Sequence, residues 1–207
     1  MIGCVNEIGE RQKADNVSGL LGESGFREYM NQLDTPLETG YLLRIGIDHF
    51  KEINDNFGQE YGDFVLKKTA ECISGCTSEG QKVYKLVADE FLILDASSDE
   101  AQDADKLYDK VRETIDRFIE TNEFKVIYTV SGGIVPFAAL KGNQYAEALK
   151  LTDFALNEAK KLGRNRCYIF NGETYRKFLR KREITQELRE AVINGFQGFT
   201  AFTSCIC

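Results

Sequence analysis

Apolar residues recur along the chain at two spacings, and these predict alternating strands and helices. Short, nearly continuous apolar runs are typical of buried strands, and the clearest run is Tyr41 to Ile47. Strands are predicted at 41–47, 83–86, 91–94, 124–135 and 167–170. Apolar positions three or four residues apart predict amphipathic helices at 18–33, 60–76, 98–120, 143–162 and 173–194. Asp48 is expected to cap a further short helix that ends near Asn54.

The order of these elements predicts an α/β or α+β fold. Strands alternate with helices, but the runs at 83–86 and 91–94 are separated by only four residues, which is the layout of a hairpin. A hairpin inside an alternating pattern favours a mixed sheet covered by helices.

Composition and charge exclude several classes of protein. The chain has 207 residues, 43% of them hydrophobic and 29% charged, which is typical of a globular protein. Its 33 acidic and 26 basic residues give a net charge of −7, which makes duplex nucleic acid a poor partner. The longest apolar runs, such as Phe91 to Leu94, are far too short to cross a bilayer. We therefore expect no nucleic-acid partner and no membrane segment.

The number and spacing of cysteines and histidines give little support to a structural zinc site or to a catalytic triad that needs a histidine. The single histidine is His49, and the cysteines have irregular spacing without a Cys-x-x-Cys pair. They are Cys4, Cys72, Cys76, Cys167, Cys205 and Cys207. We interpret them as reduced, mostly buried thiols of a cytoplasmic protein.

Three polar clusters follow the ends of predicted strands, where open α/β sheets usually place their sites. The first is Asp48 with residues 51, 54 and 55, the second is the pair Asp89-Glu90 in the hairpin, and the third is a group of cations around Gly163. Each cluster has an ordinary explanation, as a helix cap, a solvated turn or cations at a helix C-terminus. Their joint position is more informative.

The order and spacing of the clusters resemble the GGDEF family, the diguanylate cyclases that join two GTP molecules into cyclic di-GMP. Five segments carry the resemblance: DNVSGLLGESGF (15–26), IGIDHFKEINDNFGQEYGDFVL (45–66), LVADEF (86–91), VSGGIV (130–135) and TDFALNEAKKLGRNR (152–166). The resemblance implies a five-stranded, mostly antiparallel central sheet flanked by helices, related to nucleotide cyclase catalytic domains.

The resemblance also implies a binding role for five residues. Asn54 and Asp63 match the family's guanine-reading positions, and an amide with a carboxylate suits the donors and acceptors of a guanine edge. Lys51, Lys160 and Arg164 match positions that contact the phosphates of GTP. GTP or another guanine nucleotide is therefore the expected ligand.

The metal and catalytic positions are implied in the same way. Asp89 matches a metal-binding acid, Glu90 matches the neighbouring acid implicated in catalysis, and Ile47 offers a backbone carbonyl that meets Mg²⁺ in the family. The family's remaining Mg²⁺ carboxylate is replaced here by Gly46. Loss of a hard oxygen ligand is expected to weaken the metal that offsets the triphosphate charge. Asp48, two residues further on, is interpreted as a helix cap rather than a replacement ligand.

Other departures affect the hairpin and its surroundings. The family's paired glycines are Val87 and Ala88, and neither residue favours a positive φ angle as glycine does. Gly22-Glu23 replaces the family's Asn-Arg, Gln59 replaces its histidine, and Ser78-Glu79-Gly80-Gln81 stands where a product-inhibition motif is expected. Glu90 is therefore predicted to be vestigial, and the chain to be a degenerate, catalytically inactive member.

The two ends resemble neighbouring domains of the same signalling systems. Residues 1–14 resemble the tail and linker of a PAS sensor domain, 15–171 the GGDEF domain, and 172–207 a linker helix with the opening of an EAL domain. The leading hypothesis is a GTP-binding or dimerising regulatory module beside PAS-like and EAL-like partners. An active diguanylate cyclase, working as a homodimer with Mg²⁺, and a purely structural spacer remain open alternatives.

Overall fold

The computed structural model describes residues 14–33, 37–98, 101–121, 124–141 and 144–193. The chain divides into two compact units, Met1–Phe170 and Asn171–Cys207, and each is described by itself. The predicted PAS-like tail lies outside the described residues except for Ala14, and so does the predicted EAL-like segment beyond residue 193.

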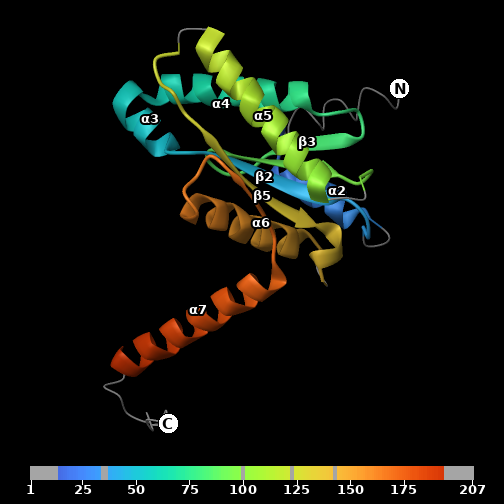
Figure 1. Cartoon of the computed structure of the whole chain (residues 1–207), viewed down its shortest axis with the longest axis vertical. Coiled ribbons are helices and arrows are strands. Elements are labelled where there is room, and N and C mark those ends of the chain that lie inside the picture. Colours follow the sequence, from blue (N-terminus) through green and yellow to red (C-terminus); the bar gives the residue numbers. More distant parts are fainter. Residues whose placement is uncertain (1–13, 34–36, 99–100, 122–123, 142–143, 194–207) are drawn as a thin grey trace. The chain divides into compact units, whose positions relative to one another are not determined.

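A six-stranded sheet forms the centre of the first unit, with the order β1-β3-β4-β2-β5-β6 (Figure 1). The strands are β1 (Leu21–Gly22), β2 (Tyr41–Ile47), β3 (Gln81–Lys85), β4 (Glu90–Asp95), β5 (Val130–Pro136) and β6 (Cys167–Ile169). The four inner strands pair antiparallel, whereas β1 and β6 join the edges in parallel. The expected mixed sheet is therefore confirmed, but five strands was an underestimate by one.

Helices cover both faces of this sheet. They are α2 (Glu23–Asn31), α3 (Phe50–Phe57), α4 (Gln59–Cys76), α5 (Ala101–Thr121) and α6 (Gln144–Lys161), together with a 3₁₀ turn at Phe137–Ala139. Consecutive glycines in β5 show how the faces are divided. A Cβ atom on Gly132 would meet Tyr108 of α5, and one on Gly133 would meet Ala155 and Leu156 of α6. Because successive strand residues face opposite sides, α5 and α6 lie on opposite faces.

The main hydrophobic core lies between the sheet and the α3–α4–α5 side. Alternate residues of β2, including Leu43, Ile45 and Ile47, are fully buried there and pack with Val65 and Ile73 of α4. The other face of β2 is directed to α6, and it is this face that carries Arg44 and Gly46. One strand therefore supplies the core with one side and the site described below with the other.

Several element boundaries differ from the sequence expectation. The predicted helix at 18–33 begins only at Glu23, because Leu21–Gly22 pairs in parallel with Tyr84–Lys85 of β3. The predicted strand at 124–135 pairs only from Val130 onward. A β-rich composition favours an extended chain, but pairing also requires a neighbouring strand at the same level.

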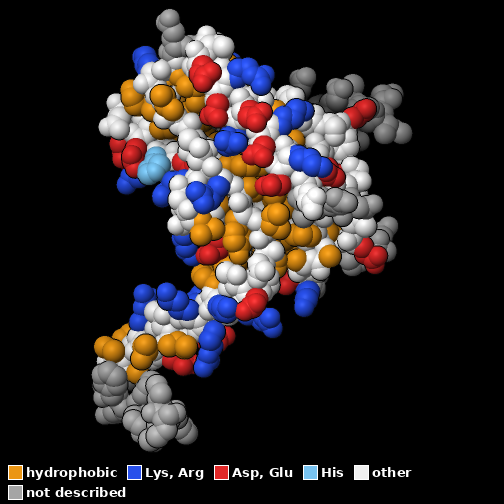
Figure 2. All heavy atoms as spheres, viewed as in Figure 1, with side chains coloured by type: hydrophobic (Ala, Val, Ile, Leu, Met, Phe, Trp, Pro, Cys, Tyr) orange, Lys and Arg blue, Asp and Glu red, His pale blue; other side chains and the backbone are white. Residues whose placement is uncertain are grey.

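The second unit contains helix α7 (Gly172–Ile193). Ile184, Leu188 and Val192 recur every four residues and are 42%, 49% and 61% exposed. Figure 2 shows hydrophobic side chains gathered toward the C-terminal part of this helix, among charged ones. Within the described residues, none of the helices combines the length and the apolar character that a bilayer crossing requires.

Candidate functional site

The neighbouring ends of β2 and β4 bring four positions singled out from the sequence together. Gly46 lies opposite Glu90 in the antiparallel register. The backbone N–H of Ile47 donates to the carbonyl of Asp89 at 3.3 Å. The structure therefore places Gly46, Ile47, Asp89 and Glu90 side by side where the inner strands β2 and β4 meet.

Two cations surround the carboxylate of Glu90. Nε of Arg44 donates to Oε2 of Glu90 at 2.8 Å, and Nη2 of Arg44 donates to the same oxygen. Nζ of Lys160, in the last turn of α6, lies 4.0 Å from the other carboxylate oxygen. The three side chains are only 12%, 25% and 18% exposed for Arg44, Lys160 and Glu90. Such low exposure weakens screening by water, so these charges interact strongly.

Arg44 is fixed by α6 as well as by Glu90. Its Nη1 donates to the carbonyl of Leu149 at 3.1 Å, and its Nη2 lies 3.7 Å from a carboxylate oxygen of Asp153. The guanidinium is therefore tied to β4 on one side and to α6 on the other, with little freedom to move away from Glu90.

Lys160 also reaches the space beside Gly46. A Cβ atom built on Gly46 would lie 3.2 Å from Nζ of Lys160 and 3.2 Å from Cδ2 of Leu156. Any larger residue at this position would project toward the ammonium group. The region where the family carries a metal-binding carboxylate thus borders a side-chain cation.

The hairpin between β3 and β4 is held from inside by a buried lysine. Nζ of Lys85, a residue 5% exposed, donates to the carbonyls of Leu86 at 2.9 Å and of Ala88. Ala88 has a φ of 56°, whereas Val87 is not in the positive-φ region and is 69% exposed. The strain expected from losing the paired glycines therefore falls on Ala88 alone.

Burial changes the proton affinity of both charged groups near this turn. Desolvation lowers the pKa of Lys85, and the acids at 15, 89 and 90 oppose that shift. Desolvation also raises the pKa of Asp89, and the nearby Lys160 ammonium only partly opposes it.

Asp48 has a different role from the predicted one. Its carboxylate accepts hydrogen bonds from the hydroxyls of Thr129 at 2.7 Å and Ser131 at 2.8 Å, and from the backbone N–H of Asn165 at 3.2 Å. Helix α3 is capped by His49, without a side-chain hydrogen bond. The prediction that Asp48 caps this helix was wrong, because its side chain turns into the structure and joins β2, β5 and the loop after α6.

The predicted guanine readers lie where α3 meets α4. The carboxamide of Asn54 fits against Gly62 so closely that a Cβ atom there would overlap its Oδ1. Among the described residues, this buried oxygen has no hydrogen-bond partner. Asp63 follows Gly62 directly and accepts a hydrogen bond from Nε2 of Gln59 at 3.1 Å. A buried amide oxygen without a partner in the described residues, close in sequence to a carboxylate, is suited to a ligand that supplies N–H donors.

The remaining phosphate candidates are exposed. Lys51 lies in the first turn of α3, and Arg164 lies in the loop after α6 with a φ of 61°. The backbone N–H of Arg164 donates to the carbonyl of Ala159 at 3.2 Å, and Asp48 holds the next residue, Asn165. Asp48 therefore fixes the loop that carries Arg164, a role that sequence reasoning missed.

The sequence analysis also did not single out Arg44 as a site residue, although the sequence contains a signal for it. It is the only charged residue in the apolar run 41–47, and a charge in a buried strand requires a partner. The sequence does not reveal that the partner is Glu90.

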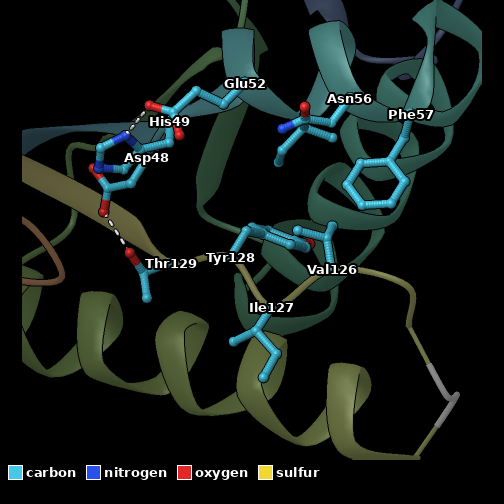
Figure 3. A pocket seen from close by; sticks show the side chains of 10 residues that line it. Asp48, His49, Glu52, Asn56, Phe57, Val126, Ile127, Tyr128 and Thr129 are labelled. Carbon is cyan, nitrogen blue, oxygen red and sulfur yellow. Dashed lines mark hydrogen bonds and ion pairs between the residues drawn. The ribbon is translucent and has the colours of Figure 1, made fainter.

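A separate cavity of about 300 Å³ lies on another side of α3 (Figure 3). Its walls come from α3 and from the segment that precedes β5. The lining residues are Asp48, His49, Glu52, Ile53, Asn56, Phe57, Val126, Ile127, Tyr128 and Thr129. Neither Asn54 nor Lys160 is among them, so this cavity is not the predicted nucleotide site.

Within the described ranges, no group of three or more His, Cys, Asp or Glu side chains is arranged to hold a metal ion. Cys72, Cys76 and Cys167 are free thiols, and burial raises the pKa of Cys72 to about 11. The other three cysteines lie outside the described residues.

Comparisons with known proteins identify the family. The family described as "Diguanylate cyclase, GGDEF domain" matches residues 13–166. Diguanylate cyclase DgcZ of Escherichia coli is 31% identical over 162 residues, which are 76% of this chain and 53% of that protein. Cyclic di-GMP phosphodiesterase NbdA of Pseudomonas aeruginosa is 28% identical over 182 residues, 86% of this chain and 23% of that protein. The chain thus spans about a quarter to a half of these relatives.

Solved structures share the fold. The GGDEF domain of TpbB (YfiN) from Pseudomonas aeruginosa superposes with a TM-score of 0.69 at 24% identity, over 80% of this chain and 99% of that one. An S helix–GGDEF–EAL fragment of Vibrio cholerae LapD reaches a TM-score of 0.66 at 19% identity, over 90% of this chain and 45% of that one. The match to the family covers well over half of the sequence, and this chain belongs to the GGDEF family.

Proposed function

We propose that this chain is a GGDEF domain of bacterial cyclic di-GMP signalling that binds a guanine nucleotide without converting it to cyclic di-GMP. On this proposal Asn54 and Asp63 read the base, while Lys51, Lys160 and Arg164 hold the phosphates. Within the described residues the buried Oδ1 of Asn54 has no partner, and this supports the base-reading part, since an N–H donor of the guanine edge would satisfy it.

The single observation that carries the loss of catalysis is the neutralisation of Glu90. Both of its oxygens face side-chain cations, and Gly46 contributes no carboxylate. Magnesium requires hard oxygen ligands in a near-octahedral arrangement, and it usually enters a site through one or two free carboxylates. Asp89 and the carbonyl of Ile47 are the candidate ligands that remain, and within the described residues no group of three or more His, Cys, Asp or Glu side chains is arranged to hold an ion, so we derive no catalytic step through it.

A regulatory role follows as part of the same proposal. NbdA, which matches 86% of this chain, is named as a phosphodiesterase, and the LapD fragment of similar fold includes an EAL domain. These relatives support a module that responds to nucleotide and acts on PAS-like and EAL-like neighbours, alone or as a homodimer. The boundaries at residues 14 and 171 and the role of α7 as a linker are part of this proposal.

The direct test is a calorimetric titration of the 207-residue chain with GTP. We expect binding at micromolar to millimolar nucleotide that weakens at least about tenfold in Asn54→Ala and Asp63→Ala, because each removes polar contacts to the base. The matched control is Asn56→Ala, on the same helix but lining the other cavity, which is expected to bind normally. Absence of binding to the unaltered chain would favour a structural spacer instead.

An active diguanylate cyclase is the second candidate, because relatives at 28–31% identity carry that name. Incubation with GTP and Mg²⁺, followed by chromatography, separates the two candidates. Steady accumulation of cyclic di-GMP above a sample without protein would overturn the proposed loss of catalysis.

A further inference from the structure

The cavity beside α3 has an acidic side and an apolar side. Figure 3 shows Asp48, His49 and Glu52 on one side and Phe57 and Val126 on the other. The volume of about 300 Å³ lies at the lower end of the range found for small-molecule sites. This division favours a small ligand with one polar end and one apolar end.

The acidic side keeps a carboxylate available to a ligand. Glu52 is paired through one oxygen with Nδ1 of His49 at 2.6 Å, and this pair is exposed, so it is weak. A carboxylate can accept several hydrogen bonds, which leaves Glu52 able to accept from a further donor. Asp48 is 3% exposed, and the three groups that donate to it are neutral hydroxyls and a backbone N–H. Its negative charge therefore adds to that of Glu52.

Cations in the neighbouring elements do not line the cavity. They are Lys51, Lys125, Lys160, Arg164 and Arg166. All but Lys160 are exposed, so water screens their charges. Nζ of Lys160 lies 4.0 Å from a carboxylate oxygen of Glu90, which offsets its charge. The lining residues themselves include two acids and no lysine or arginine. The polar end of a ligand should therefore be a cation.

The apolar side leaves hydrophobic surface in contact with water. Phe57 is 42% exposed and Ile127 is 85% exposed, and both line the cavity together with Val126. Ile53 and Tyr128, which are buried, complete the lining on this side. A flat apolar group laid against Phe57 and Ile127 would remove this surface from water, which stabilises the bound state.

We propose that this cavity binds a small organic cation in which an aromatic body carries an ammonium group. The body lies against Phe57 and Ile127, and the ammonium group donates to the carboxylate of Glu52. Asn56, four residues further along α3, offers a carboxamide oxygen as a second acceptor. Neither Asn54 nor Asp63 lines the cavity, so this site is independent of the proposed nucleotide site.

Three probes with one ring test the site: phenethylamine, phenethyl alcohol and phenylacetate, which are cationic, neutral and anionic. Each is titrated into the 207-residue chain and followed by heteronuclear NMR of the backbone amides. We expect phenethylamine to bind with a dissociation constant of roughly 0.1–1 mM and to shift the signals of His49, Asn56 and Ile127. It should bind about threefold more tightly than the alcohol, and phenylacetate should bind most weakly. Equal affinities, shifts confined to other regions, or no shifts at millimolar probe would overturn the proposal.

Phe57→Ala tests the apolar side. We expect it to weaken phenethylamine binding about fivefold or more, because a wall of the cavity is removed. Phe64→Ala is the matched control, since its ring is 41% exposed but does not line the cavity. It should bind the amine as the unaltered chain does. An equal loss in both variants would contradict the assigned position of the ring.

Glu52→Gln tests the acidic side. The amine should bind about threefold more weakly, whereas binding of the neutral alcohol should not change. Glu60→Gln, which alters an exposed acid in the first turn of α4 outside the lining, should change neither affinity. All four substituted residues are exposed, and the thermal midpoint of each variant checks its fold. Unaltered amine binding in Glu52→Gln would overturn the assigned role of this carboxylate.

Discussion

Two groups of residues at the candidate site, a base side at the α3–α4 junction and a cation side on β2, β4 and α6, differ in how far the protein itself satisfies their polar atoms. On the base side, Asn54 packs against Gly62 at the α3–α4 junction, and its buried Oδ1 has no hydrogen-bond partner in the part of the chain that the structure describes. On the cation side, Arg44 and Lys160 surround Glu90, and its oxygens are already in use. The amide oxygen of Asn54 can still accept a hydrogen bond from a ligand, whereas the carboxylate of Glu90 is already paired with a cation. Different elements carry the two groups: α3 and α4 carry the base side, and β2, β4 and α6 carry the cation side.

The largest expected effect comes from separating α6 from the sheet. In Gly133→Val, the new side chain would meet the backbone of Ala155 at 2.7 Å and overlap that of Leu156. Overpacking against backbone should cost about 3 kcal/mol or more, which corresponds to a fall of about 6–12 °C in the thermal midpoint. The cation side should be lost first, since Lys160 belongs to α6. Gly172→Ala, where a Cβ meets open space, should melt as the unaltered chain does.

Asp48→Asn should have the next largest effect, because Asp48 ties the end of β2 to β5 and to the loop after α6. Its carboxylate accepts from Thr129, Ser131 and Asn165, and a carboxamide cannot accept from all three donors with both of its heteroatoms. We expect a loss of about 2–3 kcal/mol in the free energy of unfolding. Urea titration measures it. An unchanged midpoint would show that these hydrogen bonds contribute nothing to stability.

Gly62→Ala should damage the base side alone. The methyl group would occupy the place of Oδ1 of Asn54 and force that side chain to turn away. We expect GTP affinity to fall about tenfold or more, with little change in thermal stability. Gly75→Ala is the matched control on the same helix, since its Cβ meets nothing within 4 Å. Equal affinities for the two variants would contradict the assignment of Asn54 as a base reader.

In the hairpin, glycine substitutions at Val87 and Ala88 should change the stability of the fold in opposite directions. Ala88→Gly should stabilise the fold by about 1 kcal/mol, because Ala88 has a φ of 56°. Val87→Gly should destabilise by about 0.5–1 kcal/mol, since Val87 needs no positive φ and glycine adds freedom to the unfolded chain. Differential scanning calorimetry measures the thermal midpoint of both variants. Midpoints that move in the same direction would contradict the backbone conformations assigned to Val87 and Ala88.

The smallest expected effect is the pH dependence that Asp95 adds to thermal stability. Neutral groups donate hydrogen bonds to this carboxylate, whereas Glu90 is paired with a cation. Burial alone would raise the pKa of Asp95, but hydrogen bonds from Ser97 and Gln81 outweigh it and the pKa lies below its usual value. A pKa that is lower in the folded state adds stability above the unfolded value, and this is lost as pH falls through the folded value. The thermal midpoint should therefore decline at acidic pH, less steeply in Asp95→Asn.

Much of the fold could be predicted because its elements have clear local patterns. The run 41–47 is the strand β2 in full, and helices α4 and α6 lie within one or two residues of the predicted ranges. The motif spacing also named the family, which the profile match confirms. The individual roles of Asn54, Asp63, Lys51, Lys160 and Arg164 stay predictions.

What the sequence determined by itself was therefore the alternation of elements, the family and the absence of a carboxylate at Gly46. The tertiary structure decided the rest: that β1 pairs at the sheet edge, that Asp48 turns inward, and that Arg44 meets Glu90, 46 residues away. Periodicity assigns a side chain to a face of its own strand or helix. Which side chain it meets depends on strand register and helix packing, and these are set by distant parts of the chain.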